Sequence, residues 1–230
     1  MPQTGGNCNT AASASVSPNC GPSLDCPEGV GSSKRVVSVS WMIQMKRQSE
    51  FATLAGGCFW CTEAVFKRVK GVISVQPGFT GGHVENPSWE EVCTGTTGHA
   101  EAVRIEFDPT QITFEELLDV FFRTHDPTTL NQQGNDKGPE YRSAIFYHDE
   151  NQRKLAEGVK AKLNSESVYG GSIVTQISAS TAFYPADDYH KNFYESGHRP
   201  DYCFFVIDPK LRKLFERFDH HVKAEYKNTR

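Results

Sequence analysis

The chain has 230 residues, with 24 lysines and arginines against 28 aspartates and glutamates, which gives a net charge of −4. This balance gives no reason to expect nucleic acid or an anionic membrane surface as a partner. No apolar run approaches the roughly 20 residues that a helix needs to cross a bilayer, and the N-terminus lacks the apolar core of a signal peptide. We therefore expect a soluble, cytoplasmic protein, with organellar targeting by its N-terminal region left open.

The composition changes near residue 45. Residues 1–45 are rich in Ser, Gly, Pro, Asn and Thr and predict a flexible, low-complexity extension, because such a segment buries too little apolar surface to become ordered. Residues 46–230 carry the signals of a folded domain. The odd number of cysteines, seven, does not suit a disulfide-stapled scaffold. Cys8, Cys20 and Cys26 lie in the extension, and we interpret them as thiols without a role.

Strand and helix signals alternate through the domain. The predicted elements are, in chain order, a strand over 51–55 closed by Gly56-Gly57, a helix over 58–69, strands over 72–79 and 100–107, a helix that starts at the capping box of Thr113 and Glu116, a strand over 143–147, a helix over 151–163, a strand over 172–179 and a helix over 208–222. This alternation predicts a single α/β domain with helices packed on a mixed sheet.

The strongest local feature is the run Gly56-Gly57-Cys58-Phe59-Trp60-Cys61, where the first strand meets the first helix. A cysteine in the first turn of a helix faces free N–H groups and the positive end of the helix dipole, so we expect the pKa of Cys58 to fall and its thiolate to act as a nucleophile. The two aromatic residues after it predict the walls of an apolar pocket. Cys61 completes a Cys-x-x-Cys pair, which is equally typical of a redox disulfide or half of a zinc site.

The run Gly-Cys-Phe-Trp resembles the signature of the A-type peptide methionine sulfoxide reductases. Further matches follow in the order expected for that family, over roughly residues 50 to 218. They are Gly81-Gly82, Asn86-Pro87-Ser88, Val92-Cys93-Thr94-Gly95, Thr97-Gly98-His99-Ala100-Glu101-Ala102-Val103, His125-Asp126-Pro127, Gln133-Gly134-Asn135-Asp136, Tyr141-Arg142-Ser143-Ala144-Ile145, Phe183-Tyr184, Ala186, His190 and Tyr202-Cys203. The resemblance implies an α+β two-layer sandwich with a ferredoxin-like core.

The resemblance also implies a reaction, the reduction of the S epimer of methionine sulfoxide, free or within proteins. Cys58 would attack the sulfur, and Glu101 would give a proton to the departing oxygen, which needs a carboxyl with a raised pKa. The substrate would be held by Phe59, Trp60, Asp136, Tyr141 and Trp89, the last standing where most relatives have tyrosine. Cys58 would become a sulfenic acid, then a disulfide that thioredoxin or another dithiol reduces. No cofactor or metal is implied, and we expect a monomer.

Several alternatives stay open. Either Cys203, at the family's C-terminal resolving position, or Cys61, one helical turn away, could resolve Cys58; we favour Cys203, with Cys61 as a relay. Asp136 could be a turn residue, and Cys93 is best interpreted as packing. Rival functions are a general disulfide oxidoreductase using Cys58 and Cys61, a metal-binding module that adds Cys93 and a histidine, and a cysteine hydrolase in which Cys58 works with one of the structural histidine candidates His99 or His125.

Overall fold

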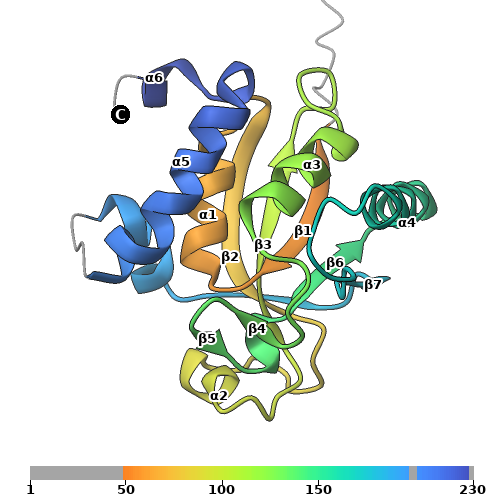
Figure 1. Cartoon of the computed structure of the whole chain (residues 1–230). Coiled ribbons are helices and arrows are strands. Elements are labelled where there is room, and N and C mark those ends of the chain that lie inside the picture. Colours follow the sequence, from red (N-terminus) through yellow and green to blue (C-terminus); the bar gives the residue numbers. More distant parts are fainter. Residues whose placement is uncertain (1–48, 197–200, 228–230) are drawn as a thin grey trace, which may run out of the picture. The chain divides into compact units, whose positions relative to one another are not determined.

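The computed structural model describes residues 49–196 and 201–227, and it contains a six-stranded mixed sheet (Figure 1). The strands lie in the order β7-β6-β1-β3-β2-β8, and all neighbours are antiparallel except the parallel pair β6 and β7. Their bounds are Glu50–Gly56 for β1, Val72–Thr80 for β2, Ala100–Phe107 for β3, Ser143–Tyr147 for β6, Gln176–Ala179 for β7 and Phe183–Pro185 for β8.

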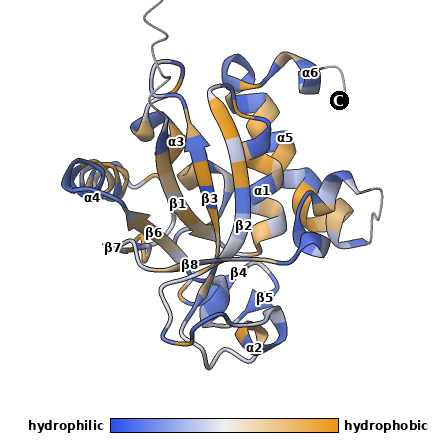
Figure 2. Ribbon diagram, turned by 180° about the vertical axis from the view of Figure 1, so that it is seen from behind, coloured by the Kyte–Doolittle hydropathy of each residue, from blue (hydrophilic) through white to orange (hydrophobic). Residues whose placement is uncertain are grey.

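Helices pack against one face of this sheet, and from behind the strands lie in front of them (Figure 2). The helices that contact the strands are α1 (Phe59–Lys67), α3 (Phe114–Thr124) and α4 (Glu150–Ser165), and α5 (Asp208–Arg217) packs on α1 and α3. Two short helices, α2 (Trp89–Cys93) and α6 (Ala224–Lys227), complete the helical elements of the described residues. The remaining elements are the short hairpin of β4 (Gln132–Gln133) and β5 (Asp136–Lys137), four 3-10 turns, and a π-helical stretch, Cys203–Ile207, that runs directly into α5. None of the helices in the described ranges has the length and apolar character needed to cross a bilayer.

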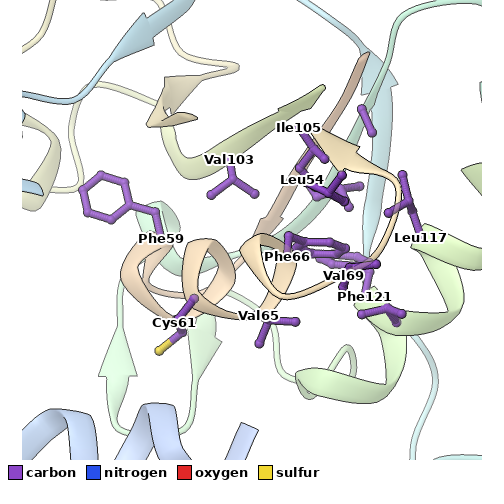
Figure 3. Close-up of a cluster of buried hydrophobic side chains, with 14 of the residues drawn as sticks. Leu54, Phe59, Cys61, Val65, Phe66, Val69, Val103, Ile105, Leu117 and Phe121 are labelled. Carbon is purple, nitrogen blue, oxygen red and sulfur yellow. The ribbon is translucent and has the colours of Figure 1, made fainter. Parts of the chain in front are cut away.

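Alternation along the strands decides which side chains face the helices. Val103, Ile105 and Phe107 of β3 are fully buried in the main core with Leu54 of β1, and Figure 3 shows this cluster against Val65, Phe66 and Val69 of α1. The alternate residues Ala100 and Ala102 join a smaller cluster on the other face with Ala55, Ala144 and Phe146. Glu101 has the parity of Val103, so the strand directs this glutamate towards the helical layer.

The predicted elements are confirmed with adjusted ends. The capping box of Thr113 and Glu116 is present at the start of α3, and the helix after the glycine turn begins at Phe59 with Cys58 as its N-cap. The strand predicted over 172–179 is shorter, and the helix predicted over 208–222 ends at Arg217, where Phe218 leaves the helical conformation. The predicted extension over 1–45 and the start of the domain at 46 lie outside the described residues.

Candidate active site

The antiparallel pairing of β1 with β3 brings the two most important predicted residues together. Leu54 is the register partner of Val103, so the end of β1 lies beside the start of β3, and Glu101 comes under the first turn of α1. Gly57 makes the turn between β1 and Cys58 with a φ of +89°, and a Cβ there would lie 2.5 Å from Cγ of Gln133. A glycine is therefore required where the strand delivers Cys58 to the helix.

A small pocket of about 70 Å³ opens above this junction. It brings together every substrate-binding residue expected from the sequence, with the two catalytic residues Cys58 and Glu101, and it adds Tyr202. Its lining consists of Cys58, Phe59, Trp60, Trp89, Glu101, Asp136, Tyr141 and Tyr202. Two of the four predicted catalytic residues, Cys61 and Cys203, are fully buried and do not line the pocket. The volume suits the end of one side chain.

Glu101 is 2 % exposed, and both of its carboxyl oxygens accept hydrogen bonds. The backbone N–H of Phe59 donates to Oε2 at 2.9 Å, and the indole N–H of Trp89 donates to Oε1 at 3.3 Å. Burial nevertheless raises the pKa of Glu101 to about 8, because desolvation of the charged form outweighs these two donors. The side chain is therefore a proton donor at neutral pH. Trp89, which stands where most relatives have tyrosine, holds this acid in place.

The expected fall in the pKa of Cys58 is wrong for this structure. Burial raises the pKa of Cys58 well above that of an ordinary thiol, whereas a hydrogen bond from Cys58 lowers the pKa of Cys61 to about 6. Cys58 is the N-cap of α1, but its side chain accepts no N–H from the first turn, and the N–H of Phe59 is donated to Glu101 instead. The two thiols act as one titrating pair that loses its first proton easily and its second with difficulty.

Tyr202 links this dithiol to the polar side of the pocket. Its hydroxyl donates to Oδ2 of Asp136 at 2.7 Å and lies 3.7 Å from Sγ of Cys61. Desolvation raises the pKa of Tyr202, which keeps the hydroxyl protonated and able to donate. Sequence reasoning missed this role, although Tyr202 precedes Cys203 in the matched motif. Asp136, for which a simple turn was the alternative, bonds across the site.

Aromatic rings build the outer wall of the pocket. Trp60 stacks on Phe193 with the ring centroids 3.7 Å apart and the planes 7° apart. His190 lies between the rings of Phe59 and Trp89, at 5.4 Å and 5.2 Å from their centroids. Burial lowers the pKa of His190, so it contributes as a neutral ring.

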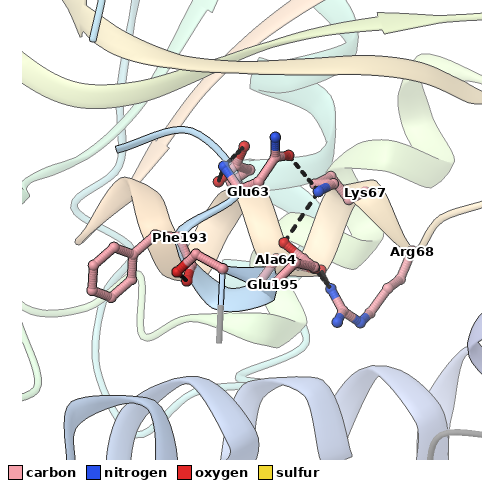
Figure 4. A network of polar contacts seen from close by, with 8 residues as sticks. Glu63, Ala64, Lys67, Arg68, Phe193 and Glu195 are labelled. Atoms are coloured by element: carbon pink, nitrogen blue, oxygen red, sulfur yellow. Dashed lines mark hydrogen bonds and ion pairs between the residues drawn. The ribbon is translucent and has the colours of Figure 1, made fainter. Parts of the chain in front are cut away.

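A buried carboxyl holds this wall against α1 (Figure 4). Glu63, 1 % exposed, accepts the backbone N–H of Asn192 at 3.0 Å, and Asn192 sits in the left-handed region at φ 56°. One turn further along α1, Lys67 and Arg68 pair with Glu195 at 3.1 Å and 2.8 Å. Burial raises the pKa of Glu63 to about 7. Sequence reasoning missed this anchor, because Glu63 looks like any other charged residue on an amphipathic helix.

The remaining candidates have structural surroundings. His99 pairs with the N–H of Gly82 and the carbonyl of Val84, and His125 with the carbonyl of Phe121 and the hydroxyl of Ser143, so neither points to Cys58 as a base. Cys203 starts the π-helical stretch that packs on α1. Within residues 49–196 and 201–227, no group of three or more His, Cys, Asp or Glu side chains is arranged to hold a metal ion. None of the four cysteines of these ranges forms a disulfide.

Comparisons with known proteins agree with this geometry. The family model described as peptide methionine sulfoxide reductase matches residues 50–222. The peptide methionine sulfoxide reductase MsrA of Saccharolobus solfataricus is 55 % identical over 174 residues, which cover 76 % of this chain and 97 % of the relative. The peptide methionine sulfoxide reductase MsrA of Erwinia tasmaniensis is 52 % identical, and the match covers 77 % of this chain and 99 % of the relative.

Solved structures give the same result. Reduced Mxr1 of Saccharomyces cerevisiae matches with a TM-score of 0.61 and 34 % identity, over 66 % of this chain and 87 % of Mxr1. Methionine sulfoxide reductase A of Corynebacterium diphtheriae matches with a TM-score of 0.58 and 35 % identity, over 65 % of this chain and 75 % of that enzyme. An acid and a thiol pair under an aromatic wall, on a fold shared with these enzymes, leave one assignment: the chain belongs to the peptide methionine sulfoxide reductases, a family of oxidoreductases.

Proposed function

We propose that this enzyme reduces the S epimer of methionine sulfoxide, free or within a polypeptide, and so repairs oxidised proteins. The observation that carries the proposal is the position of Glu101, a carboxyl that keeps its proton at neutral pH in the same small pocket as Cys58. Sulfoxide oxygen leaves only if it gains a proton, and a buried, neutral carboxyl is suited to supply it. Phe59 and Trp60 offer the terminal methyl group an apolar wall.

The first chemical step joins Cys58 to the substrate sulfur. Cys58 attacks as its proton passes to the thiolate of Cys61, while the proton of Glu101 goes to the sulfoxide oxygen as the S–O bond weakens. The protonated oxygen then moves as a hydroxyl from the substrate sulfur to the sulfur of Cys58. The bond between the two sulfurs breaks with its electron pair going to the substrate sulfur, which leaves a sulfenic acid on Cys58, reduced methionine, the carboxylate of Glu101 and the thiol of Cys61. Tyr202, bonded to Asp136 and close to Cys61, supports the charge on the dithiol. The polar side of the pocket is completed by Tyr141, whose pKa is raised by burial.

Epimer selectivity follows from the asymmetry of the pocket. The substrate sulfur carries three different groups, and each must meet a different part of the site. The methyl group meets the aromatic wall, the oxygen meets Glu101, and the rest of the substrate leaves through the mouth of the pocket. Only one of the two configurations at sulfur allows all three contacts. We expect purified enzyme with dithiothreitol to reduce the S epimer alone, when the R and S epimers are supplied separately. Cys58→Ser should lose this activity, and the control Cys93→Ser should keep it. Equal reduction of both epimers would contradict the proposal.

We propose that Cys203 is the main thiol that resolves the sulfenic acid, by forming a disulfide with Cys58 and releasing water. Cys203 is buried on an element that packs against α1, and Cys61, whose thiol is hydrogen-bonded to that of Cys58, would act as a relay. In Cys203→Ser, we expect one equivalent of methionine per enzyme and little further turnover with thioredoxin. Full multiple turnover in this variant would remove Cys203 from the cycle, and the same assay on Cys61→Ser measures the relay.

The proposed enzyme needs a reductant and a defined oligomeric state. The disulfide would be reduced by thioredoxin or another dithiol without a bound cofactor, and the enzyme would act as a cytoplasmic monomer. We expect the core to be ferredoxin-like. Its main elements occur along the chain in the order β1, α1, β2, β3, α3 and β6, with short elements between some of them, and its strands lie in the sheet in the order β6-β1-β3-β2. Size-exclusion chromatography with light scattering tests the monomer.

A further inference from the structure

A second and larger hollow, of about 540 Å³, lies beside the site. Four cationic side chains line it, and Asp126 is the only carboxylate among its lining residues. The cations are Arg123 of α3 and Lys210, Lys213 and Arg217 of α5. The last three recur at the spacing of one helical face, and the rest of the lining is largely polar. On a chain whose net charge is −4, this is a local concentration of positive charge.

Three of the four cations of this hollow have no ion-pair partner among the described residues. Arg123 pairs with Asp119, but in the described part of the chain no ion pair is formed by Lys210, Lys213 or Arg217. Oδ1 of Asp126 is already used by the N–H and the hydroxyl of Thr128. Burial lowers the pKa of His125, on the floor of the hollow, to about 4, and Lys210 and Lys213 add to that shift. Lys210, Lys213 and Arg217 thus offer an anionic group positive charges that no ion pair within residues 49–196 and 201–227 uses.

The hairpin of β4 and β5 stands between the hollow and the pocket. Gln133 lines the hollow, its register partner Asp136 lines the pocket, and paired residues on adjacent strands are only ~5 Å apart. The charge of Lys210 also acts on the dithiol, since it helps the hydrogen bond from Cys58 to lower the pKa of Cys61. An extended chain advances ~3.3 Å per residue, so a polypeptide with one side chain in the pocket reaches the hollow within a few residues.

We infer that this hollow is a subsite for acidic residues that flank methionine sulfoxide in a polypeptide substrate. The inference deepens and rests on the proposed function, because it names the sequences that the same site prefers. The catalytic pocket holds the end of one side chain and has no room for flanking residues, which must bind outside it. Carboxylates are the groups that clustered lysine and arginine side chains recognise, and their attraction also speeds encounter.

Two oxidised peptides that differ only in flanking charge test the inference. Each has a central methionine sulfoxide, flanked on both sides by two glutamates in one and by two lysines in the other, and dithiothreitol serves as the reductant. We expect kcat/KM to be roughly tenfold higher for the acidic peptide at low salt, mostly through KM, and the preference to shrink as salt rises. N-acetylmethionine sulfoxide, which reaches only the pocket, measures the chemistry alone.

The double variant Lys213→Glu with Arg217→Glu reverses two charges of the hollow at exposed positions. It should abolish or reverse the peptide preference while kcat/KM for N-acetylmethionine sulfoxide stays as in the wild type. The double variant Arg212→Glu with Lys154→Glu makes the same change in net charge at exposed positions that do not line the hollow, and it should keep the preference.

An unchanged preference in the first double variant would overturn the inference, as would equal rates for the two peptides with the wild-type enzyme. A rise confined to the KM for thioredoxin, with peptide rates unaffected, would assign the hollow to the reductant instead and overturn it too. Failure to reduce N-acetylmethionine sulfoxide would remove the proposed function, and the subsite with it, and is therefore distinguishable from failure of the subsite alone.

Discussion

Glu101 and Glu116 each accept a backbone N–H at the start of a helix, the former at α1 and the latter at α3. At α3 the acid and the capping Thr113 are three residues apart, lie near solvent, and bond reciprocally. The hydrogen bond from Thr113 lowers the pKa of Glu116. At α1 the acid comes from β3, 42 residues away in sequence, and burial raises its pKa to about 8. The same hydrogen bond therefore gives stability at α3 and a proton donor at α1, because burial differs.

Replacing the buried acid by its amide should have the largest effect. In Glu101→Gln the side chain keeps its shape and an acceptor for the N–H of Phe59 but has no proton to transfer, so we expect kcat to fall by roughly a thousandfold.

Wild-type activity should rise with pH near 6, as the dithiol loses its first proton, and fall near 8, as Glu101 loses its own. The variant should lack the fall near 8 in a pH profile of single-turnover rates. A fall of the same shape in the variant would show that another group controls it.

Glu63 provides a third case, since it is buried and accepts a backbone N–H but lies away from the chemistry. Its pKa is raised from an ordinary 4.5 to about 7 in the folded protein, so folding favours the protonated form. Stability from this group is complete below about pH 4.5 and is lost as pH rises through 7, by roughly 3 kcal/mol.

Glu63→Gln should therefore match the wild type at pH 5 and exceed it at pH 8. Urea unfolding at the two pH values measures the difference between the proteins, which cancels the contribution of other groups. Glu140→Gln is a matched control, because Glu140 is also a buried glutamate but takes no part in the bond to Asn192. A difference that is the same at both pH values would show that Glu63 is charged throughout.

The exposed capping box should have the smallest effect. Thr113→Ala removes the acceptor for the N–H of Glu116, at 3.2 Å, and should lower the free energy of unfolding by about 1 kcal/mol. We expect kcat to be unchanged, because none of the residues that line the pocket belongs to α3. Denaturant unfolding and steady-state rates check this together. A loss of activity in excess of the loss of folded protein would mean that the α3 start is coupled to the site.

The strands and helices were predictable because their signals are local. In strand β3, the alternation of side chains between the two faces of the sheet can be detected within its eight residues. The capping box of α3 occupies only the four residues from Thr113 to Glu116. The motif around Cys58 likewise lies within one run of the chain and led to the family before any geometry was known. The π-helical stretch Cys203–Ile207 and the short helix α2 were missed, since their lengths are too small for periodicity to be detected.

The sequence by itself thus determined which residues could react and on which elements they lie. Only the tertiary structure decided their ionisation: Glu101 takes the N–H that was expected to serve Cys58, the thiolate is favoured at Cys61, and Tyr202 joins the dithiol to Asp136. The physical reason is one of range. Hydrogen bonds and periodicity within an element depend on neighbours in the chain, whereas desolvation and electrostatic fields sum over groups that folding alone brings together.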